Sequence, residues 1–508
     1  MNSKGGLHLD NDATVVEDAF AVNKPGPKSS RQRSTTAAYI GKGKFRLFGH
    51  YVHGQFLFLA LVEMLVLACT NYLVYTALIP AQLAYGYSWQ SAAIVGSSVS
   101  LTIIMGMAFA GLYDTRQRET FSGLSLRIGL VFLAAYGVVA ALSAYSDLMP
   151  VNKSYGVIVL LCSLSGVVVT RILFYKYLDG KILRRKIMVL GVGEKAGYID
   201  RIRRKSDKRG FELAGFVASN GCQKISVDSQ KVLHIGDSIC SYAFDNGIDE
   251  IVVALDETQE AVSEEELLEC RMHGIQVVDI ADFFERERTI LHLDLIQPDW
   301  LIFGDGFNRG YGASIVKRCL DIIVSVLLLV FTSPIIFLTM LAILLEGRGK
   351  GSILYKQERV GRAGKRFYVY KFRSMITNAE DDGVPRWAQK SDARITKVGE
   401  FIRNYRIDEL PQLWNVLKGD MSLVGPRPER PQFVKQLSTI NSFYNSRHNV
   451  DPGITGWAQL CYPYGSSEQD SIQKLQYDLY YVKNRGLFLD LYILAQTVET
   501  VLFKKGAR

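Results

Sequence analysis

Residues 320–345 read LDIIVSVLLLVFTSPIIFLTMLAILL, an almost wholly apolar run that is long enough to cross a bilayer as a helix. Ser333 and Pro334 interrupt its middle, and a proline removes a backbone donor and bends a helix there. Basic residues flank both ends, Lys317 and Arg318 before it and Arg348 and Lys350 after it. Because lysine and arginine stay on the cytosolic side during insertion, we expect a re-entrant helix–break–helix dipping into one leaflet. A simple kinked transmembrane helix is the alternative.

The sequence that follows this segment is crowded with charge. Three clusters are KFRSM at 371–375, RNYRIDELPQ at 403–412 and GPRP at 425–428. Arginine forks match phosphate oxygens, and lysine supplies a point charge. Several such groups around a carboxylate pair indicate a polyanionic ligand.

The carboxylate pair is Asp408 and Glu409, and Pro411 is tolerated in the first turn of a helix expected to reach Leu417 and to end near Gly419. Asp408 would then lie at a helix N-terminus, where free amides and the dipole favour a phosphate. Neighbouring helical side chains diverge by about 100 degrees, so the two carboxylates should differ in role. One can act as a covalent nucleophile and the other can hold Mg²⁺. A capping aspartate followed by a surface glutamate is the alternative.

Before the re-entrant segment, strands and helices alternate. Lys186 to Leu190 is an apolar strand that runs into a glycine turn, and further β-rich segments follow at 213–217, 250–254 and 275–280. This alternation predicts a doubly wound, Rossmann-like parallel sheet. A glycine turn before a helix can bind a pyrophosphate. Ser219 and Asn220 stand where the ribose-binding acidic residue is expected, so a structural or regulatory role is favoured over a dinucleotide cofactor.

Four apolar runs in the N-terminal part approach the roughly 20 residues of a transmembrane helix. They are Phe56 to Ile79, Ala92 to Leu112, Ile128 to Tyr145 and Tyr155 to Val169. Basic residues gather before the first run, between the second and third, and after the fourth, whereas the other two loops contain only Lys153. We therefore expect a four-helix transmembrane bundle with both ends, and everything after Arg184, in the cytosol.

The whole chain has 508 residues and a formal net charge of +9, which suits an anionic membrane surface or substrate when apolar runs are also present. Its seven cysteines form no C-x-x-C pair, so neither a disulfide framework nor a zinc site is indicated. The expected organisation is a disordered tail at 1–45, the transmembrane bundle at 46–175, the Rossmann-like domain at 183–295 and a mostly helical domain at 312–508. Leu487 to Phe503 is expected to be an interfacial amphipathic helix, and His448, beside Arg447, a surface or structural residue.

From residue 318 to 503 the sequence resembles the bacterial sugar transferases, the polyprenyl-phosphate hexose-1-phosphate transferases, and the whole chain resembles their large form. The shared motifs are Ser333-Pro334, KFRSM at 371–375, DELPQL at 408–413, MSLVGPRP at 421–428 and PGITGW at 452–457. The resemblance implies a monotopic catalytic domain on a re-entrant helix, preceded by four transmembrane helices and a Rossmann-like domain.

The resemblance also implies roles for single residues. Asp408 would attack the β-phosphorus of a nucleotide sugar, and Glu409 would be associated with Mg²⁺. Substrate handling would fall to Lys371, Arg403 and Arg427. From their places in the charged clusters, Arg373 and Gln412 are further candidates for phosphate binding. Arg406 stands where many relatives have serine or threonine, which leaves the sugar specificity open.

The function expected from this resemblance is transfer of a hexose-1-phosphate from a UDP-hexose to undecaprenyl phosphate, with release of UMP through a covalent phosphosugar–aspartate intermediate. Such a reaction would begin exopolysaccharide or O-antigen assembly at the cytoplasmic membrane, with glucose or galactose as the sugar. Expected partners are these two substrates, Mg²⁺ and the lipid bilayer, but no nucleic acid; homo-oligomerisation is left open. The alternatives are a glycosyltransferase that releases UDP and a non-catalytic membrane scaffold that senses nucleotides.

Overall fold

A computed structural model describes most of the chain between residues 44 and 502. The described residues are 44–47, 50–78, 89–113, 121–145, 153–174, 176, 184–203, 207–208, 210–218, 225–235, 238–257, 263–296, 306–307, 310–376, 394–462, 465 and 467–502. The expected tail at 1–45 lies outside them except for its last two residues, which open a hairpin made of β1 (Lys44–Leu47) and β2 (His50–His53). Ser219 and Asn220 also lie outside the described residues.

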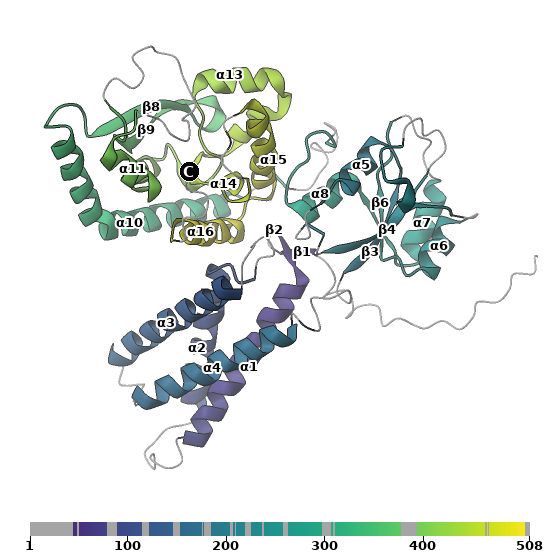
Figure 1. The fold of residues 1–508 in the computed structure, drawn as a ribbon, viewed down its shortest axis with the longest axis horizontal. Helices are drawn as coiled ribbons and strands as arrows, with labels where there is room; N and C mark the ends of the chain where they lie inside the picture. The colour runs from purple at the N-terminus through teal and green to yellow at the C-terminus, as the bar shows by residue number, and fades with distance from the viewer. Residues whose placement is uncertain are drawn as a thin grey trace, which may run out of the picture. The chain divides into compact units, whose positions relative to one another are not determined.

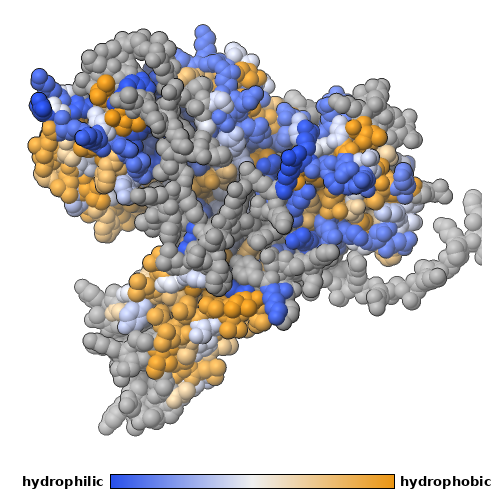
Figure 2. All heavy atoms as spheres, in the orientation of Figure 1, coloured by the Kyte–Doolittle hydropathy of each residue, from blue (hydrophilic) through white to orange (hydrophobic). Residues whose placement is uncertain are grey.

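Four apolar helices follow the hairpin, each close to its expected position. They are α1 (Gly54–Leu78), α2 (Trp89–Phe109), α3 (Phe121–Tyr145) and α4 (Lys153–Leu173), and they contact one another in chain order as well as α1 with α4. The third and fourth helices are longer than the apolar runs that predicted them. Figure 2 shows apolar residues over this part of the surface. Among the described residues, two helical segments are long and apolar enough to cross a membrane, Gly54–Val74 of α1 and Tyr311–Glu346.

The α1–α4 helices enclose a charged contact. Glu63 of α1 accepts from the Nε of Arg171 in α4 at 2.7 Å, and both side chains are buried. The hydroxyl of Tyr113, just after α2, donates to the same carboxylate at 2.5 Å. One buried ion pair thus connects α1, α4 and the residue that follows α2. Burying a charge in apolar surroundings is costly unless an opposite charge is paired with it.

The middle of the chain forms a five-stranded parallel sheet in the order β5-β4-β3-β6-β7, the order expected for a doubly wound sheet. Its strands are β3 (Arg185–Leu190), β4 (Phe211–Val217), β5 (Val232–Leu233), β6 (Glu250–Val253) and β7 (Gln276–Asp279). Helices α5 (Glu194–Asp200) and α8 (Ile280–Arg288) contribute to one hydrophobic core, and α6 (Ile239–Asp245) and α7 (Glu264–Met272) to another. Figure 1 shows these pairs on opposite faces. The parallel sheet predicted from the alternating pattern is confirmed.

The glycine turn of this sheet is filled by a side chain of the same domain. Asp256, which follows β6, accepts from the backbone N–H of Glu194 at 2.8 Å and of Lys195 at 3.0 Å. A Cβ placed on Gly193 would come within 1.8 Å of the Asp256 carboxylate. The first amides of α5 therefore already have an anionic acceptor, which favours a structural role for the glycine turn over pyrophosphate binding.

The C-terminal region begins with α10 (Tyr311–Glu346) and the hairpin β8 (Leu354–Val360) and β9 (Arg366–Phe372). It continues with α11 (Lys397–Asn404), the 3₁₀ turn η5 (Ile407–Glu409), α12 (Gln412–Lys418), β10 (Ser422–Val424), α13 (Pro431–Ile440), the 3₁₀ segment η6 (Ser442–Asn449), β11 (Gly453–Thr455), α14 (Trp457–Cys461), α15 (Glu468–Asn484) and α16 (Leu487–Leu502). One core joins α12, β10 and α13 to α15 and α16. Leu291, Leu293 and Ile296 also pack in it, so the expected border at residue 295 falls inside a shared core.

Helix α10 bends so that both of its ends reach the same domain. Arg318 donates to the carbonyl oxygens of Val416 and Leu417, whereas Ile343 packs in a cluster that includes Leu410. In a straight helix, residues 318 and 343 would lie about 37 Å apart, but residues 410 and 416, in the helical backbone at the start of α12, lie only about 9 Å apart. This difference is too large for the side chains at the two ends to bridge. Figure 1 shows α10 turning sharply partway along.

The serine–proline pair in α10 changes the hydrogen bonding of the helix backbone. Pro334 is inside α10, and the carbonyl oxygen of Val330, four residues earlier, loses the backbone donor that Pro334 lacks. The Ser333 hydroxyl donates to this oxygen at 2.8 Å. The Ser333 hydroxyl thus supplies the hydrogen bond that Pro334 cannot donate.

Candidate active site

The β8–β9 hairpin brings Lys371 to the carboxylate pair. Asn415 of α12 is fully buried, and its side-chain amide makes two hydrogen bonds to the backbone of β9. Its oxygen accepts from the N–H of Tyr370 at 3.1 Å, and its nitrogen donates to the carbonyl oxygen of Tyr368 at 2.7 Å. Lys371, the next residue along β9, then reaches Glu409 with its Nζ at 2.8 Å from Oε1. Asn415 therefore positions Lys371, a role that the sequence analysis missed because nothing in the sequence marks this asparagine as buried.

Asp408 and Glu409 are both buried, but they do not lie in the first turn of α12. They belong to η5, a separate 3₁₀ turn, and Pro411 is the residue that precedes the first turn of α12. The helix therefore begins four residues later than the sequence predicted, and binding of a phosphate at Asp408 stays a prediction. The positive charges that act on Asp408 belong to the side chains of Lys371, Arg403 and Arg406.

Glu409 accepts from two cations at one oxygen. Lys371 Nζ and Arg427 NH2 each lie 2.8 Å from its Oε1, and Arg406 NH1 lies 3.9 Å away. Burial alone would raise the pKa of Glu409, but the charges of Arg427 and Lys371 outweigh burial and hold this pKa well below its usual range. Glu409 therefore stays ionised.

Asp408 has the opposite electrostatic environment. Burial, and then the negative charge of Glu409, raise its pKa to about 6, although Lys371, Arg403 and Arg406 act in the other direction. Arg406 has φ 58°, in the left-handed region, so the backbone is strained directly before the turn that carries the pair. Adjacent carboxylates with pKa values pushed apart are expected to have different chemical roles, as the sequence analysis predicted.

Arg427 is carried by a loop with very close backbone contacts. Strands β10 and β11 pair in parallel, so the loop after β10 lies against the PGITGW motif. Gly425 N–H donates to Thr455 O at 2.9 Å, and Gly453 N–H donates to Pro426 O at 3.0 Å. A Cβ on Gly425 would lie 2.3 Å from the carbonyl oxygen of Asp451. These glycines allow the backbones of the two motifs to approach closely. The close approach fixes the position of the Arg427 backbone, from which its side chain extends toward Glu409.

The other predicted site residues differ in their placement. Arg403 of α11 is half-buried and acts on Asp408 through its charge. Gln412 is buried, and its Nε2 has no hydrogen-bond acceptor among the described residues. A buried donor without a partner is uncommon, and it suits a site that receives a ligand. Arg373 instead donates to the carbonyl oxygens of Lys350 and Ile343 at the end of α10, so it holds that helix. Its contact with phosphate stays a prediction.

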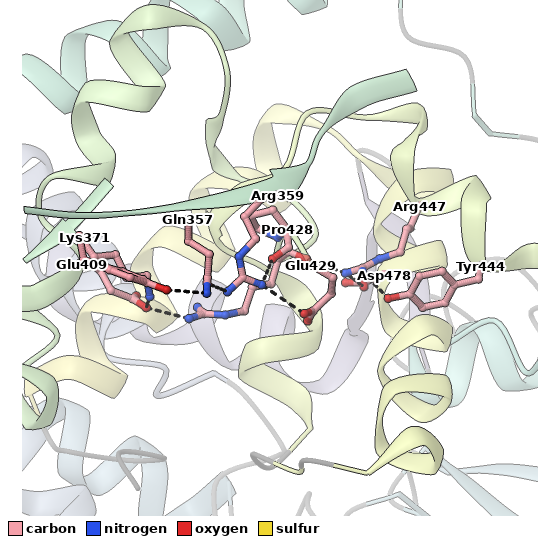
Figure 3. A network of polar contacts seen from close by, with 11 residues as sticks. Gln357, Arg359, Lys371, Glu409, Pro428, Glu429, Tyr444, Arg447 and Asp478 are labelled. Atoms are coloured by element: carbon pink, nitrogen blue, oxygen red, sulfur yellow. Dashed lines mark hydrogen bonds and ion pairs between the residues drawn. The ribbon is translucent and has the colours of Figure 1, made fainter. Parts of the chain in front are cut away.

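Figure 3 shows that the polar network continues beyond Glu409 through residues that the sequence analysis did not assign to the site. Arg359 of β8 donates to Pro428 O at 3.1 Å, and Arg447 of η6 is buried and pairs with Asp478 of α15 at 2.7 Å. His448, for which a surface or structural role was expected, is half-buried next to Arg447. A sequence does not reveal that an arginine in a polar segment will be enclosed by a helix that follows 30 residues later.

The carboxylate oxygens at this site suit Mg²⁺ only together with phosphate oxygens of a substrate. Mg²⁺ prefers oxygen ligands and is commonly held by one or two carboxylates together with substrate phosphates. Asp408 and Glu409 supply such oxygens, but two cations already bind Oε1 of Glu409. Within the described residues, the one group of three metal-ligand side chains, Cys240, Glu269 and His273, lies in the parallel-sheet region.

Comparison with known proteins identifies the region that contains this site. Residues 312–504 match the family described as bacterial sugar transferase. Over 193 residues, 38% of this chain, the sequence is 46% identical to the UDP-N-acetylgalactosamine-undecaprenyl-phosphate N-acetylgalactosaminephosphotransferase of Aeromonas hydrophila, and the match spans 45% of that protein. The chain thus covers less than half of this relative's length.

Two further relatives extend the comparison. An uncharacterized sugar transferase of Bacillus subtilis, EpsL, is 43% identical over 195 residues, which make up 90% of that protein. The UDP-glucose:undecaprenyl-phosphate glucose-1-phosphate transferase of Xanthomonas campestris pv. campestris is 27% identical over 448 residues, 85% of this chain and 92% of that protein. The similarity therefore reaches beyond the C-terminal region to most of the chain.

Proposed function

The chain belongs to the bacterial sugar transferase family, and from this premise we propose that it transfers a hexose-1-phosphate from a UDP-hexose to undecaprenyl phosphate. The observation that carries the proposal is the buried pair of carboxylates with opposite pKa shifts, surrounded by Lys371, Arg403, Arg406 and Arg427. This is an arrangement for a polyanion that is attacked by a carboxylate. The names of the relatives, which specify undecaprenyl phosphate and UDP-sugars, support the same substrates.

In the proposed first step, a carboxylate oxygen of Asp408 bonds to the β-phosphorus of the UDP-hexose. The bond from this phosphorus to the bridging oxygen breaks, and UMP leaves with that oxygen and its electron pair. In the second step, a phosphate oxygen of undecaprenyl phosphate attacks the phosphorus and frees Asp408. The pKa of about 6 leaves Asp408 largely ionised and nucleophilic at neutral pH.

The cations around the pair lower the cost of bringing an anionic nucleophile to a diphosphate. Phosphoryl transfer depends mostly on positioning and on electrostatic stabilisation of the transferred group. In this proposal Arg427 and Lys371 hold Glu409 and face the diphosphate, and Gln412 Nε2 supplies a further donor. Glu409 would hold Mg²⁺, which neutralises phosphate charge when it is bound.

We further propose that α1–α4 cross the cytoplasmic membrane and that α10 enters and leaves it on the cytosolic side. Lys317 and Arg318 before the apolar run and Arg348 and Lys350 after it support this placement, because basic residues at both ends disfavour translocation of either end. The bend at Pro334 supports it too. The proposed site then lies at the inner leaflet, where both the soluble nucleotide sugar and the lipid phosphate are present.

The test is incubation of the purified protein with UDP-glucose or UDP-galactose, Mg²⁺ and undecaprenyl phosphate, followed by identification of the released nucleotide. We expect UMP and a lipid diphosphate-linked sugar; release of UDP would instead identify a glycosyltransferase, and no release with any UDP-sugar would favour a non-catalytic scaffold.

Replacement of the proposed nucleophile tests the mechanism. Asp408→Asn should abolish turnover and also the phosphosugar adduct that mass spectrometry would detect on the wild-type protein without lipid acceptor. Asp420→Asn is the matched control, because the Asp420 carboxylate pairs with Lys418 at 3.1 Å and takes no part in the cation cluster. Full activity of Asp408→Asn would assign the nucleophile to another residue.

A further inference from the structure

Two arginines outside the family motifs hold the loop that carries Arg427. Arg447 NH2 donates to the carbonyl oxygen of Arg427 at 2.8 Å, and Arg359 NH1 donates to the next carbonyl oxygen, that of Pro428, at 3.1 Å. Figure 3 shows Arg359 and Arg447 together with Glu409 in one polar network. Consecutive carbonyl groups of one short loop are therefore each bonded to a guanidinium group.

Arg447 is itself held from two sides. Its NH2 also donates to Asp478 Oδ2 at 2.7 Å, and its NH1 donates to the hydroxyl of Tyr444 at 2.8 Å. Arg447 is 6% exposed, Asp478 3% and Tyr444 2%. The planar guanidinium group can serve a carboxylate, a hydroxyl and a carbonyl at once, since its donors point in fixed directions.

Stability alone is a weak reason for such a pair. A buried ion pair is often replaced by apolar residues of similar size without loss of stability, because removing two charges from water is costly. Arg447, held in place by Asp478 and Tyr444, instead donates a hydrogen bond to the loop backbone, at the carbonyl oxygen of Arg427. The side chain of Arg427 is 36% exposed and reaches Oε1 of Glu409 at 2.8 Å, so its direction depends on where that backbone is held.

We infer that the Arg447–Asp478 pair is a positioning device for the UDP-sugar site: it fixes the carbonyl of Arg427 and thereby directs the Arg427 guanidinium group toward Glu409 and the diphosphate. Arg447 does not touch substrate in this arrangement; it acts through Arg427. The inference rests on the proposed function, because it assigns Arg427 to the binding of a nucleotide sugar.

The same helix offers a matched control. Lys483 lies five residues after Asp478 in α15, and its Nζ pairs with Glu285 Oε2 at 2.7 Å with both side chains buried. This pair has the same separation and comparable burial, but it joins α15 to α8 and not to the 425–430 loop. A purely structural contribution of buried ion pairs in α15 should affect both pairs in the same way.

The experiment compares the double variants Arg447→Met/Asp478→Leu and Lys483→Met/Glu285→Leu, which remove each pair without leaving one charge alone. We expect the first to raise the KM for the UDP-sugar by about tenfold or more, with a thermal midpoint close to that of the wild type, since small misplacements of a binding group cost this much or more. The second should keep the wild-type KM. Wild-type kinetics in the first variant, or an equal rise in both, would overturn the inference.

A coupling measurement distinguishes action through Arg427 from a parallel effect. Arg427→Ala should weaken UDP-sugar binding, measured by calorimetry without lipid acceptor, and adding Arg447→Met/Asp478→Leu should weaken it no further; additive losses would contradict the inference. If the double variant does not fold, Arg447→Lys keeps the charge for Asp478 but lacks the fork, and it should still raise the KM. Failure of the wild-type protein to transfer sugar phosphate would instead refute the proposed function.

Discussion

Replacing Lys371 with methionine removes one of the two cations bonded to the same oxygen of Glu409, at 2.8 Å. A hydrogen bond to a charged group contributes about 1.5–3 kcal/mol. If Lys371 also stabilises charge in the transition state, its loss should lower kcat/KM by about 10- to 150-fold. The methionine side chain keeps most of the volume, so β9 and its bonds to Asn415 should remain.

The same variant should change the pH dependence in a defined direction. Lys371 lowers the pKa of Asp408, which is about 6 in the intact site, so losing this positive charge must raise that pKa. A unit charge about 6 Å away at an effective dielectric constant of about 20 contributes roughly 3 kcal/mol, or about two pKa units. The acidic midpoint of the kcat/KM profile should therefore rise by about one to two units.

The assay is the initial rate of UMP release between pH 5 and pH 9, with the protein in lipid nanodiscs and the UDP-sugar concentration varied. Lys365→Met, at the exposed tip of the same hairpin, is the control and should leave the rate and the midpoint unchanged. An unchanged or lower midpoint in the Lys371 variant would show that the titrating group is not an Asp408 that senses Lys371, which refutes the electrostatic reasoning.

Three further predictions concern the wild-type protein, the bend and the sheet. Wild-type kcat/KM should rise with pH through about 6, because Asp408 must lose its proton to attack and its pKa is raised to that value; a rate that falls over this range would contradict this role. Pro334→Ala should straighten α10 and reduce activity by about 100-fold, because the site is displaced. In part of the molecules the C-terminal region should then lie on the other side of the membrane, which labelling of an engineered cysteine in that region would detect. Asp256→Ala should lower the thermal midpoint by about 2–4 °C through loss of a helix cap costing about 1 kcal/mol, with kcat unchanged; a gain of stability would show that Asp256 is strained rather than capping.

Much of the secondary structure follows from local sequence. The strand predicted at 186–190, the apolar helices and the interruption at Ser333-Pro334 could be predicted from the sequence. Hydrophobic period, the length of an apolar run and the effect of a proline each depend on a few neighbouring residues. The motifs also indicated which carboxylates to examine. The error at Asp408 arose from extending α12 backwards through Pro411, where the chain instead forms a separate 3₁₀ turn.

Sequence by itself determined the apolar runs, the parallel sheet and the composition of the charged clusters, since each depends on neighbours along the chain. Tertiary structure alone decided which charges meet. Lys371, Glu409 and Arg427 come together from three segments, Arg373 turns to the end of α10, and Asp256 fills the glycine turn. The physical reason is that pKa values and ion pairs depend on burial and on distances across the fold, and these are set by packing between residues far apart in the sequence.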